Sequence, residues 1–222
     1  MLGRILGLCF RIAIGLLIAL AAAIVLYRFV PVPSTLMLGR WLVLKPVERD
    51  WVPLDQISPH LVRAVIASED QRFCSHSGID WVEFNKVMEN EDGPSRGAST
   101  LTMQTAKNVF LWPGRSYVRK GLEIPLAMAI DLAWGKPRVI EVYLNVAEWG
   151  EGLFGAEAAA QRYFRKSAAK LTPAEAARLA GALPNPLLRN PAKPNRALQS
   201  AAGRSLRQLG QLGALGDCAV PG

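Results

Sequence analysis

An unbroken apolar run near the N-terminus constrains this chain more than any other feature of its sequence. Residues 12–27 carry no charged side chain. As an α-helix they span about 24 Å, and extending the helix past Arg11 brings it toward the roughly 30 Å hydrocarbon core of a bilayer. We therefore predict a transmembrane helix that, with the short segment before it, occupies residues 1–28.

The charges on either side of the run predict its orientation. Arg4 and Arg11 precede the span together with the α-amino group, and Arg28 follows it. Because positive charge is favoured on the cytoplasmic side, we expect a cytoplasmic N-terminus and an extracytoplasmic main domain. Small residues at 21–23 would also suit the cleavage site of a signal peptide. The apolar run continues past them, which favours a retained anchor.

The rest of the chain has a mainly helical pattern without internal repeats or convincing strand alternation. Helices are predicted at about 58–69, 81–89, 99–109, 117–134, 137–146, 155–163 and 172–183. Pro125 should kink the longest of them. We expect a membrane-proximal connector at 29–53, a main domain at 54–190, and a C-terminal helix and tail at 191–222. Within the connector, residues 41–44 suit a short strand, a membrane-surface stretch or local packing against the domain.

The charge balance limits the partners. The chain has 26 Lys and Arg residues against 18 Asp and Glu residues, which gives a net charge of +8. This excess favours anionic partners such as nucleic acid, phospholipid surfaces or phosphate-bearing substrates. The sequence has no zinc-finger spacing, RNA-binding aromatic signature or unbroken basic run, so we expect no nucleic-acid partner.

The three cysteines lack the spacing of a metal site. Cys9 lies in the apolar N-terminus. We expect Cys74 to be a small buried hydrophobic residue and Cys218 to be an unpaired thiol in the tail, in preference to a disulfide between them.

Glu69 is the first candidate for catalysis. It follows Leu61 and Val65 at helical spacing, so it occupies the apolar side of its predicted helix. A carboxylate on a buried helix face is costly unless it is used. Desolvation there would raise its pKa toward the range of a general base. The alternative is a surface glutamate paired with Arg72 at i+3.

A glycine-rich loop and a cationic helix form the second candidate. The loop at 93–100 runs into a helix that Ser99 or Thr100 would cap, and such helix starts attract phosphate. The cationic residues nearby, and the acid that accompanies them, are Lys107, Arg115, Arg119, Lys120 and Glu123. They form either a solvated, ion-paired helix face or a cluster that holds a diphosphate, in which Glu123 orients the cations.

Four ordered motifs over residues 69–145 resemble the signatures of the peptidoglycan glycosyltransferases, glycosyltransferase family 51. The motifs are Glu69-Asp70-x-x-Phe73-x-x-His76-x-Gly78, Gly97-x-Ser99-Thr100-x-Thr102-x-Gln104-x-x-Lys107-Asn108, Arg119-Lys120-x-x-Glu123 and Lys136-x-x-x-Ile140-Glu141-x-Tyr143-Leu144-Asn145. The similarity continues through residues 155–186, and the single anchor resembles the monofunctional branch of the family. The chain departs from the family at Met103, where a glutamine is usual, at Pro125 in the third-motif helix, and around 204–207, where a fifth motif is poorly matched.

The resemblance implies a lysozyme-like helical domain on the outer face of a bacterial cytoplasmic (inner) membrane. Its substrate would be lipid II, polymerised into glycan strands with inversion and release of undecaprenyl diphosphate during cell-wall biogenesis. Glu69 would be the general base, and Glu123 would position the cations or a divalent metal. The implied substrate-binding residues are Asp70, His76, Ser99, Thr100, Gln104, Lys107, Arg115, Arg119 and Lys120. A structural histidine before Gly78 is the alternative for His76.

The resemblance implies no required cofactor. A divalent metal would be compatible with the resemblance, and no residue is predicted to be a metal ligand. The implied partners are lipid II and the growing lipid-linked glycan, the membrane, and other cell-wall synthesis proteins. Two alternatives stay open: a lytic, lysozyme-like glycosidase, which also uses a catalytic glutamate, and a basic membrane-surface scaffold without enzymatic activity.

Overall fold

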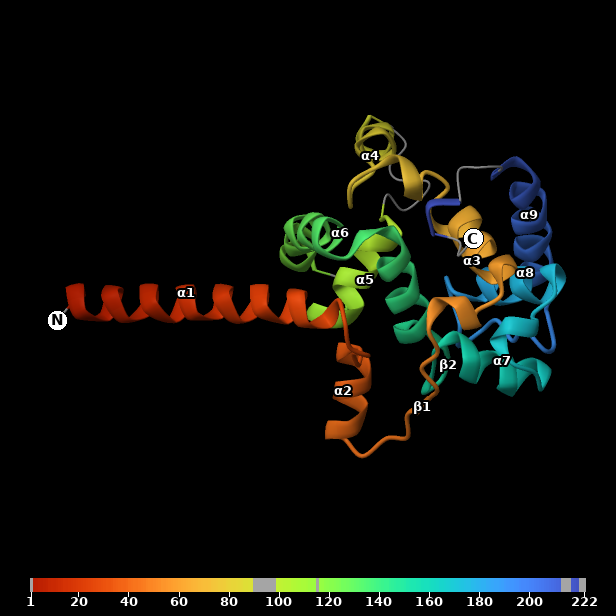
Figure 1. The fold of residues 1–222 in the computed structure, drawn as a ribbon, viewed down its shortest axis with the longest axis horizontal. Coiled ribbons are helices and arrows are strands. Elements are labelled where there is room, and N and C mark those ends of the chain that lie inside the picture. The colour runs from red at the N-terminus through yellow and green to blue at the C-terminus, as the bar shows by residue number, and fades with distance from the viewer. Residues whose placement is uncertain (1, 90–98, 115, 213–216, 220–222) are drawn as a thin grey trace.

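The computed structural model describes residues 2–89, 99–114, 116–212 and 217–219, and it confirms a mainly helical protein with one apolar N-terminal helix. Figure 1 shows α1 extending from one side of a cluster formed by the other helices. The helices are α1 (Leu2–Tyr27), α2 (Thr35–Leu42), α3 (Pro59–Glu69), α4 (Trp81–Met88), α5 (Leu101–Phe110), α6 (Tyr117–Val146), α7 (Ala156–Phe164), α8 (Pro173–Ala182) and α9 (Arg196–Leu212). Short 3-10 turns are η1 (Leu54–Gln56), η2 (Phe73–Ser75) and η3 (Ala168–Lys170).

Several helices begin at the capping residues expected from the sequence. Ser58 caps α3 and Thr100 caps α5, each by accepting a backbone N–H with its side-chain oxygen. Thr172 and Glu175 form a reciprocal capping box at the start of α8. These caps satisfy N–H groups that have no partner within the helix. Local sequence therefore sets the start of α3 and α5, the two helices that meet at the candidate site.

The predicted helices at 117–134 and 137–146 form one element, α6, with a break between its halves. Gly135 has φ 70° and ψ 167°, outside the helical range. Glycine adopts a positive φ readily because it has no Cβ. Pro125 lies within helical backbone, so the break occurs at Gly135 rather than at the proline.

A small sheet was missed by the sequence reasoning. Strands β1 (Glu48–Arg49), β2 (Glu148–Gly150) and β3 (Leu153–Phe154) lie in the order β1-β3-β2. The first pair is parallel and the second antiparallel. Strands this short cannot show an alternating pattern, which is the signal that predicts strands. The sheet joins the connector to the end of α6.

The connector contains a helix where the sequence allowed a strand. Residues 41 and 42 end α2, and their neighbours form a turn. Trp41, Leu42, Val43 and Leu44 are 49, 85, 63 and 94 % exposed, so local packing against the domain is also wrong. A contiguous exposed apolar segment favours a membrane or protein contact. Of the three interpretations of these residues, contact with a membrane surface is the one that this exposure supports.

Helix α1 is long and apolar enough to cross a membrane, and its C-terminal end is docked on the domain. The Trp134 indole N–H donates to the Ile24 carbonyl at 2.7 Å. Arg138 Nη2 donates to the Tyr27 carbonyl at 2.8 Å. The Tyr27 ring stacks on Phe110 of α5 at 5.6 Å between centroids. Most of the other α1 side chains are exposed and apolar. The C-terminal end is therefore the part of α1 that attaches this helix to α5 and α6.

The expectation of two unpaired thiols at Cys74 and Cys218 was wrong. The two cysteines form a disulfide with a Cα–Cα distance of 5.8 Å, across a sequence separation of 144. Sequence spacing cannot reveal this pair, because folding brings the C-terminal tail back over α3. Asp217 of the tail pairs with Arg63 of α3 at 2.8 Å. Helix α3 packs against α8 and α9 on the same side of the domain.

Candidate active site

Glu69 is the last residue of α3, and side chains from α5 and α6 hold its carboxylate. Gln104 Nε2 donates to Glu69 Oε2 at 3.2 Å. The Tyr143 hydroxyl donates to Gln104 Oε1 at 3.1 Å. Burial, and secondarily the charge of Glu69, raises the pKa of Tyr143 well above its usual value, so the tyrosine stays a donor. This chain of hydrogen bonds gives Glu69 a defined orientation.

The departure at Met103 leaves this contact intact. Met103 is 1 % exposed and belongs to the hydrophobic core, whereas Gln104 reaches Glu69. One residue on an α-helix turns the side chain by about 100°, so neighbouring positions face different sides. Only the second of the two positions faces the glutamate.

Two cations of α6 pair with one acid of the same helix, and Lys107 of α5 lies near them; we call Lys107, Arg119, Lys120 and Glu123 the cation cluster. Arg119 donates to Glu123 Oε1. Lys120 Nζ lies 2.8 Å from Glu123 Oε2 and 2.6 Å from Ser99 Oγ. Arg119 is 8 % and Glu123 3 % exposed, so this part of α6 is not a solvated face. Glu123 holds both cations in place.

Burial and neighbouring positive charge lower the pKa values of both lysines. Burial lowers the pKa of Lys107, and the charge of Arg119 lowers it further, although Glu69 acts in the opposite direction. Burial, Arg119 and Lys107, in that order, lower the pKa of Lys120 to about 8. Positive charge is therefore concentrated beyond what Glu123 neutralises, and an anion would relieve the repulsion.

Two pockets lie beside these groups. One of about 410 Å³ adjoins the cation cluster and is lined by Thr35, Leu36, Lys107, Asn108, Trp112, Pro113, Gly114 and Arg119. The other, of about 330 Å³, adjoins the end of α3 and is lined by Ser68, Glu69, Ala180, Gly181, Pro184, Arg189, Ala201, Arg204 and Gln208. We call the second one the Glu69 pocket. The carboxylate thus faces one space, while the cations Lys107 and Arg119 face another.

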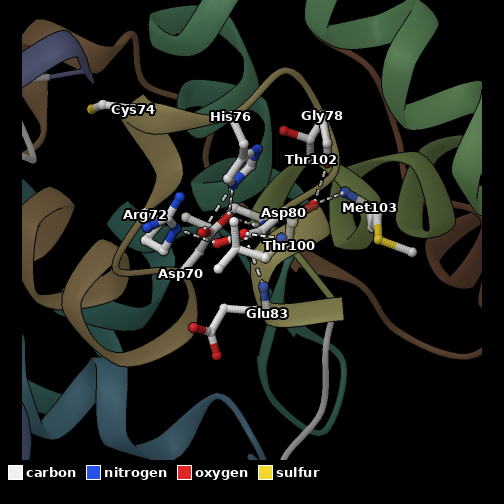
Figure 2. Close-up of polar contacts among 12 residues, drawn as sticks. Asp70, Arg72, Cys74, His76, Gly78, Asp80, Glu83, Thr100, Thr102 and Met103 are labelled. Carbon is white, nitrogen blue, oxygen red and sulfur yellow. Dashed lines mark hydrogen bonds and ion pairs between the residues drawn. The ribbon is translucent and has the colours of Figure 1, made fainter. Parts of the chain in front are cut away.

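Asp70, Arg72, His76 and Asp80 form a second polar group, which we call the loop network (Figure 2). His76 Nε2 lies 3.1 Å from both Asp70 oxygens, and Asp70 Oδ2 accepts the Leu101 N–H at 2.9 Å. Arg72 Nε pairs with Asp80 Oδ2 at 3.0 Å. The side chains of Asp70, His76 and Asp80 are almost fully buried. We assign the network to positioning Glu69 and the start of α5.

Thr100 and Gly78 complete this junction. The Thr100 hydroxyl donates to the Gly78 carbonyl at 2.6 Å and is buried. Gly78 has φ 81°, and a Cβ there would lie 2.7 Å from the Ala127 carbonyl oxygen. Only glycine fits this close approach to α6. Asp70, His76 and Thr100, which the resemblance implied as substrate-binding residues, are therefore engaged inside the protein rather than lining either pocket.

Among the described residues, the candidate metal ligands are already engaged by protein partners. Asp70, His76 and Asp80 bring candidate ligand atoms within 4.8 Å of one another. However, Asp80 already binds Arg72 and two N–H groups of α4, and Asp70 binds His76 and the start of α5. A metal would have to displace a paired cation. Both oxygens of Glu123 are likewise engaged by Arg119 and Lys120.

Some expected residues cannot be placed, and others were missed. Arg115 and the loop at 93–98 lie outside the described residues. Tyr143, quoted only as part of a motif, holds Gln104. Arg189 and Arg204 line the Glu69 pocket, although no role was carried onto them from the sequence. The sequence signal for a role of these two arginines was weak, because Arg204 lies on α9 and Arg189 on the segment before it, far from the four motifs.

Comparison with known proteins agrees with this geometry. A family model described as Transglycosylase matches residues 37–210. Three relatives carry the name biosynthetic peptidoglycan transglycosylase. The relative from Brucella suis biovar 1 (strain 1330) is 50 % identical over 215 residues, covering 93 % of this chain and 96 % of its own. Those from Agrobacterium fabrum and Rhodospirillum centenum are each 51 % identical, over 90 and 94 % of this chain and 93 and 92 % of theirs.

A lysozyme-like helical domain with a held glutamate beside a cation cluster defines a glycosyl-transferring enzyme, and the chain belongs to the transglycosylase family. The family match spans the main domain, the connector from Met37 and most of α9.

Proposed function

We propose that this enzyme is a peptidoglycan glycosyltransferase that polymerises lipid II into glycan strands and releases undecaprenyl diphosphate. The single observation that carries the proposal is that Lys107 of the cation cluster interacts with the charge of the held Glu69 carboxylate. A base and a diphosphate site are the two parts that this reaction needs. The names of the relatives support the peptidoglycan substrate class.

Glu69 would act as the general base. It takes the proton from the 4-hydroxyl of the acceptor's N-acetylglucosamine as that oxygen attacks the anomeric carbon of the donor's N-acetylmuramic acid. One C–O bond forms and the bond to the lipid diphosphate breaks, so the centre inverts. The hydrogen bond from Gln104 orients the carboxylate toward the proton that it accepts.

The cation cluster would stabilise the departing diphosphate. Negative charge grows on this group as the glycosidic bond forms, so fixed cations act more strongly on the transition state than on the ground state. Lys107 and Arg119 face the adjoining pocket, and Leu36 and Trp112 give that pocket apolar walls suited to the start of a lipid chain. No metal-dependent step is needed.

The anchor would keep the enzyme on the membrane that carries its substrate. Helix α1 would span the cytoplasmic membrane once, with its N-terminus inside and the domain outside. The exposed residues 41–44 would rest on the outer leaflet. Partners in cell-wall synthesis would meet the domain on that side.

A lytic glycosidase has less support. Hydrolysis of a glycan needs a carboxyl pair and water at the cut bond, and it leaves no diphosphate to hold. The surplus of buried positive charge beside Glu69 is therefore better explained by a diphosphate leaving group.

The test is a lipid II polymerisation assay on the full chain and on Glu69→Gln. We expect the wild type to make glycan and the variant to fold normally but to lose turnover by on the order of 10²-fold or more, as for loss of a positioned base. Glu83→Gln is the matched control, because Glu83 lies on α4 in an exposed pair with Lys86. Near-normal turnover in Glu69→Gln would remove this residue from the mechanism.

A further inference from the structure

The Cys74–Cys218 disulfide connects the two walls of the Glu69 pocket. Glu69 ends one wall, and Cys74 follows it within the loop that leads to His76. Arg204 and Gln208 form the α9 wall, and Cys218 follows them in the tail. Figure 2 shows the Cys74 side chain pointing away from the loop network, toward the outside of the loop. The bridge thus joins the loop after Glu69 to the tail after α9.

Other contacts of the described tail residues are weaker than this covalent link. Arg63 of α3 pairs with Asp217 at 2.8 Å, but the two side chains are 44 and 54 % exposed. Exposed ion pairs contribute little to stability. Ala219 is buried at 1 % exposure, yet its methyl group removes little apolar surface from water. The bridge is therefore the main link between the tail and the catalytic loop.

We infer that this disulfide is an oxidative modification that the chain acquires after export, and that the oxidised form is the fully active enzyme. The inference rests on the proposed function for the side of the membrane that the domain occupies. Disulfides persist outside the cytoplasm and are rare within it. An extracytoplasmic protein disulfide would exchange with the two thiols. The new S–S bond forms at Cys74 and Cys218, and the oxidant leaves as a dithiol that carries both electrons and both protons.

The consequence of the bridge is a fixed position of the loop that follows Glu69 relative to the tail, because α3 already holds Glu69 against α9 by packing and by the hydrogen bond from Ser205 to the Ala64 carbonyl. The loop network already ties Asp70 and Gly78 to the start of α5, so one side of the loop is held without the bridge. The α9 side has no such polar tie to the loop among the described residues. Reduction should therefore loosen the loop that follows Glu69, while the packing of α3 on α9 and the cation cluster keep their shape.

The first test is chemical and does not depend on activity. Full-length protein is extracted from membranes with free thiols blocked by N-ethylmaleimide, and then digested with trypsin without reduction. We expect the peptides 73–86 and 208–222 to appear as one linked pair, with the blocking group on Cys9 alone. In a host that lacks its extracytoplasmic thiol oxidant, the linked pair should fall. Blocked thiols on both peptides from the normal host, or undiminished linkage in the deficient host, would overturn the inference.

The second test measures the role of the bridge in catalysis. The double variant Cys74→Ser, Cys218→Ser is compared with Cys9→Ser, which changes the exposed cysteine of α1. We expect polymerisation to fall about threefold to tenfold in the double variant, because a loosened loop beside the base costs rate. Dithiothreitol should slow wild type to the same level and leave the double variant unchanged. A wild-type rate and thermal midpoint in the double variant would overturn the catalytic part. A wild type that links its peptides but makes no glycan would instead contradict the proposed function.

Discussion

The loop network and the cation cluster are both largely buried polar groups close to Glu69, yet their charges are arranged in opposite ways. In the loop network, each carboxylate has its partners within the group: Asp70 has His76, and Asp80 has Arg72. In the cation cluster, Arg119 and Lys120 share Glu123, and Lys107 adds a third positive charge beside them. Buried charge is tolerated when it is paired. This difference indicates that the loop network builds the site, whereas the cation cluster, with its surplus positive charge, binds the anionic substrate.

Disrupting the loop network should have the largest effect on stability. Asp70→Ala removes the partner of His76 and leaves the Leu101 N–H without its acceptor. We expect a loss of about 2–6 kcal/mol, because two buried hydrogen-bonding groups would each be left unsatisfied at about 1–3 kcal/mol. Thermal unfolding measures this, with Glu83→Ala as the exposed control. An unchanged midpoint would mean that the loop network does not hold the junction.

Disrupting the cation cluster should instead lower the rate of turnover. Arg119→Ala and Lys107→Ala should each slow polymerisation by on the order of 10²-fold, similar to the loss of one preorganised donor. Arg207→Ala, an exposed change on α9, should matter little. Rates and thermal midpoints are measured on the same variants. If these variants lose stability but not rate, the cluster is structural and the contrast with the loop network fails.

Raising the pH should weaken the cation cluster without unfolding the protein. The pKa of Lys120 is lowered to about 8, so this lysine loses its proton as pH rises through 8. We expect KM for lipid II to rise several-fold from pH 8 to pH 9.5, and Lys120→Arg to remove the rise because arginine stays charged.

The contribution of Lys120 to protein stability should change with pH in the opposite direction to its contribution to substrate binding. Because its folded pKa lies below the usual 10.5, the unfolded chain binds more protons between about pH 8 and 10.5. This contribution to the free energy of unfolding should therefore increase with pH in that window. Comparing thermal midpoints of wild type and Lys120→Arg over the same range separates it from other groups. A midpoint difference that moves the other way would contradict the assigned pKa.

Truncating the anchor should have the smallest effect on chemistry. Deleting residues 1–19 keeps the docked end of α1 at Ile24 and Tyr27, whereas deleting 1–28 uncovers Phe110 and Trp134. In detergent we expect an unchanged rate for the first truncation, and a lower thermal midpoint but retained activity for the second.

In membranes both truncations should lose apparent affinity, because the anchor raises the local concentration of enzyme at its substrate. Initial rates in vesicles that carry lipid II measure this loss. A chain without residues 1–19 that folds by circular dichroism but makes no glycan in detergent would show that the anchor shapes the site itself.

Sequence reasoning predicted the elements whose causes are local. The caps at Ser58, Thr100 and Thr172 and the apolar run at 12–27 depend on residues within a few turns of each other. The spacing of the cations on α6 was equally local. The missed features depend on pairs far apart in the chain, including the small sheet and the disulfide.

For this protein the sequence by itself determined the helices, their caps, the apolar anchor and the residue types available for chemistry, because these follow from backbone propensity and periodicity. Only the tertiary structure decided which polar residues face a pocket. Gln104 and Met103 are neighbours in sequence, but packing sends one to Glu69 and the other to the core. Asp70 and Glu69 are also neighbours, but folding places the Asp70 side chain in the interior and the Glu69 side chain at the candidate site. Burial and partner geometry are properties of the assembled fold, so no local pattern could assign those roles.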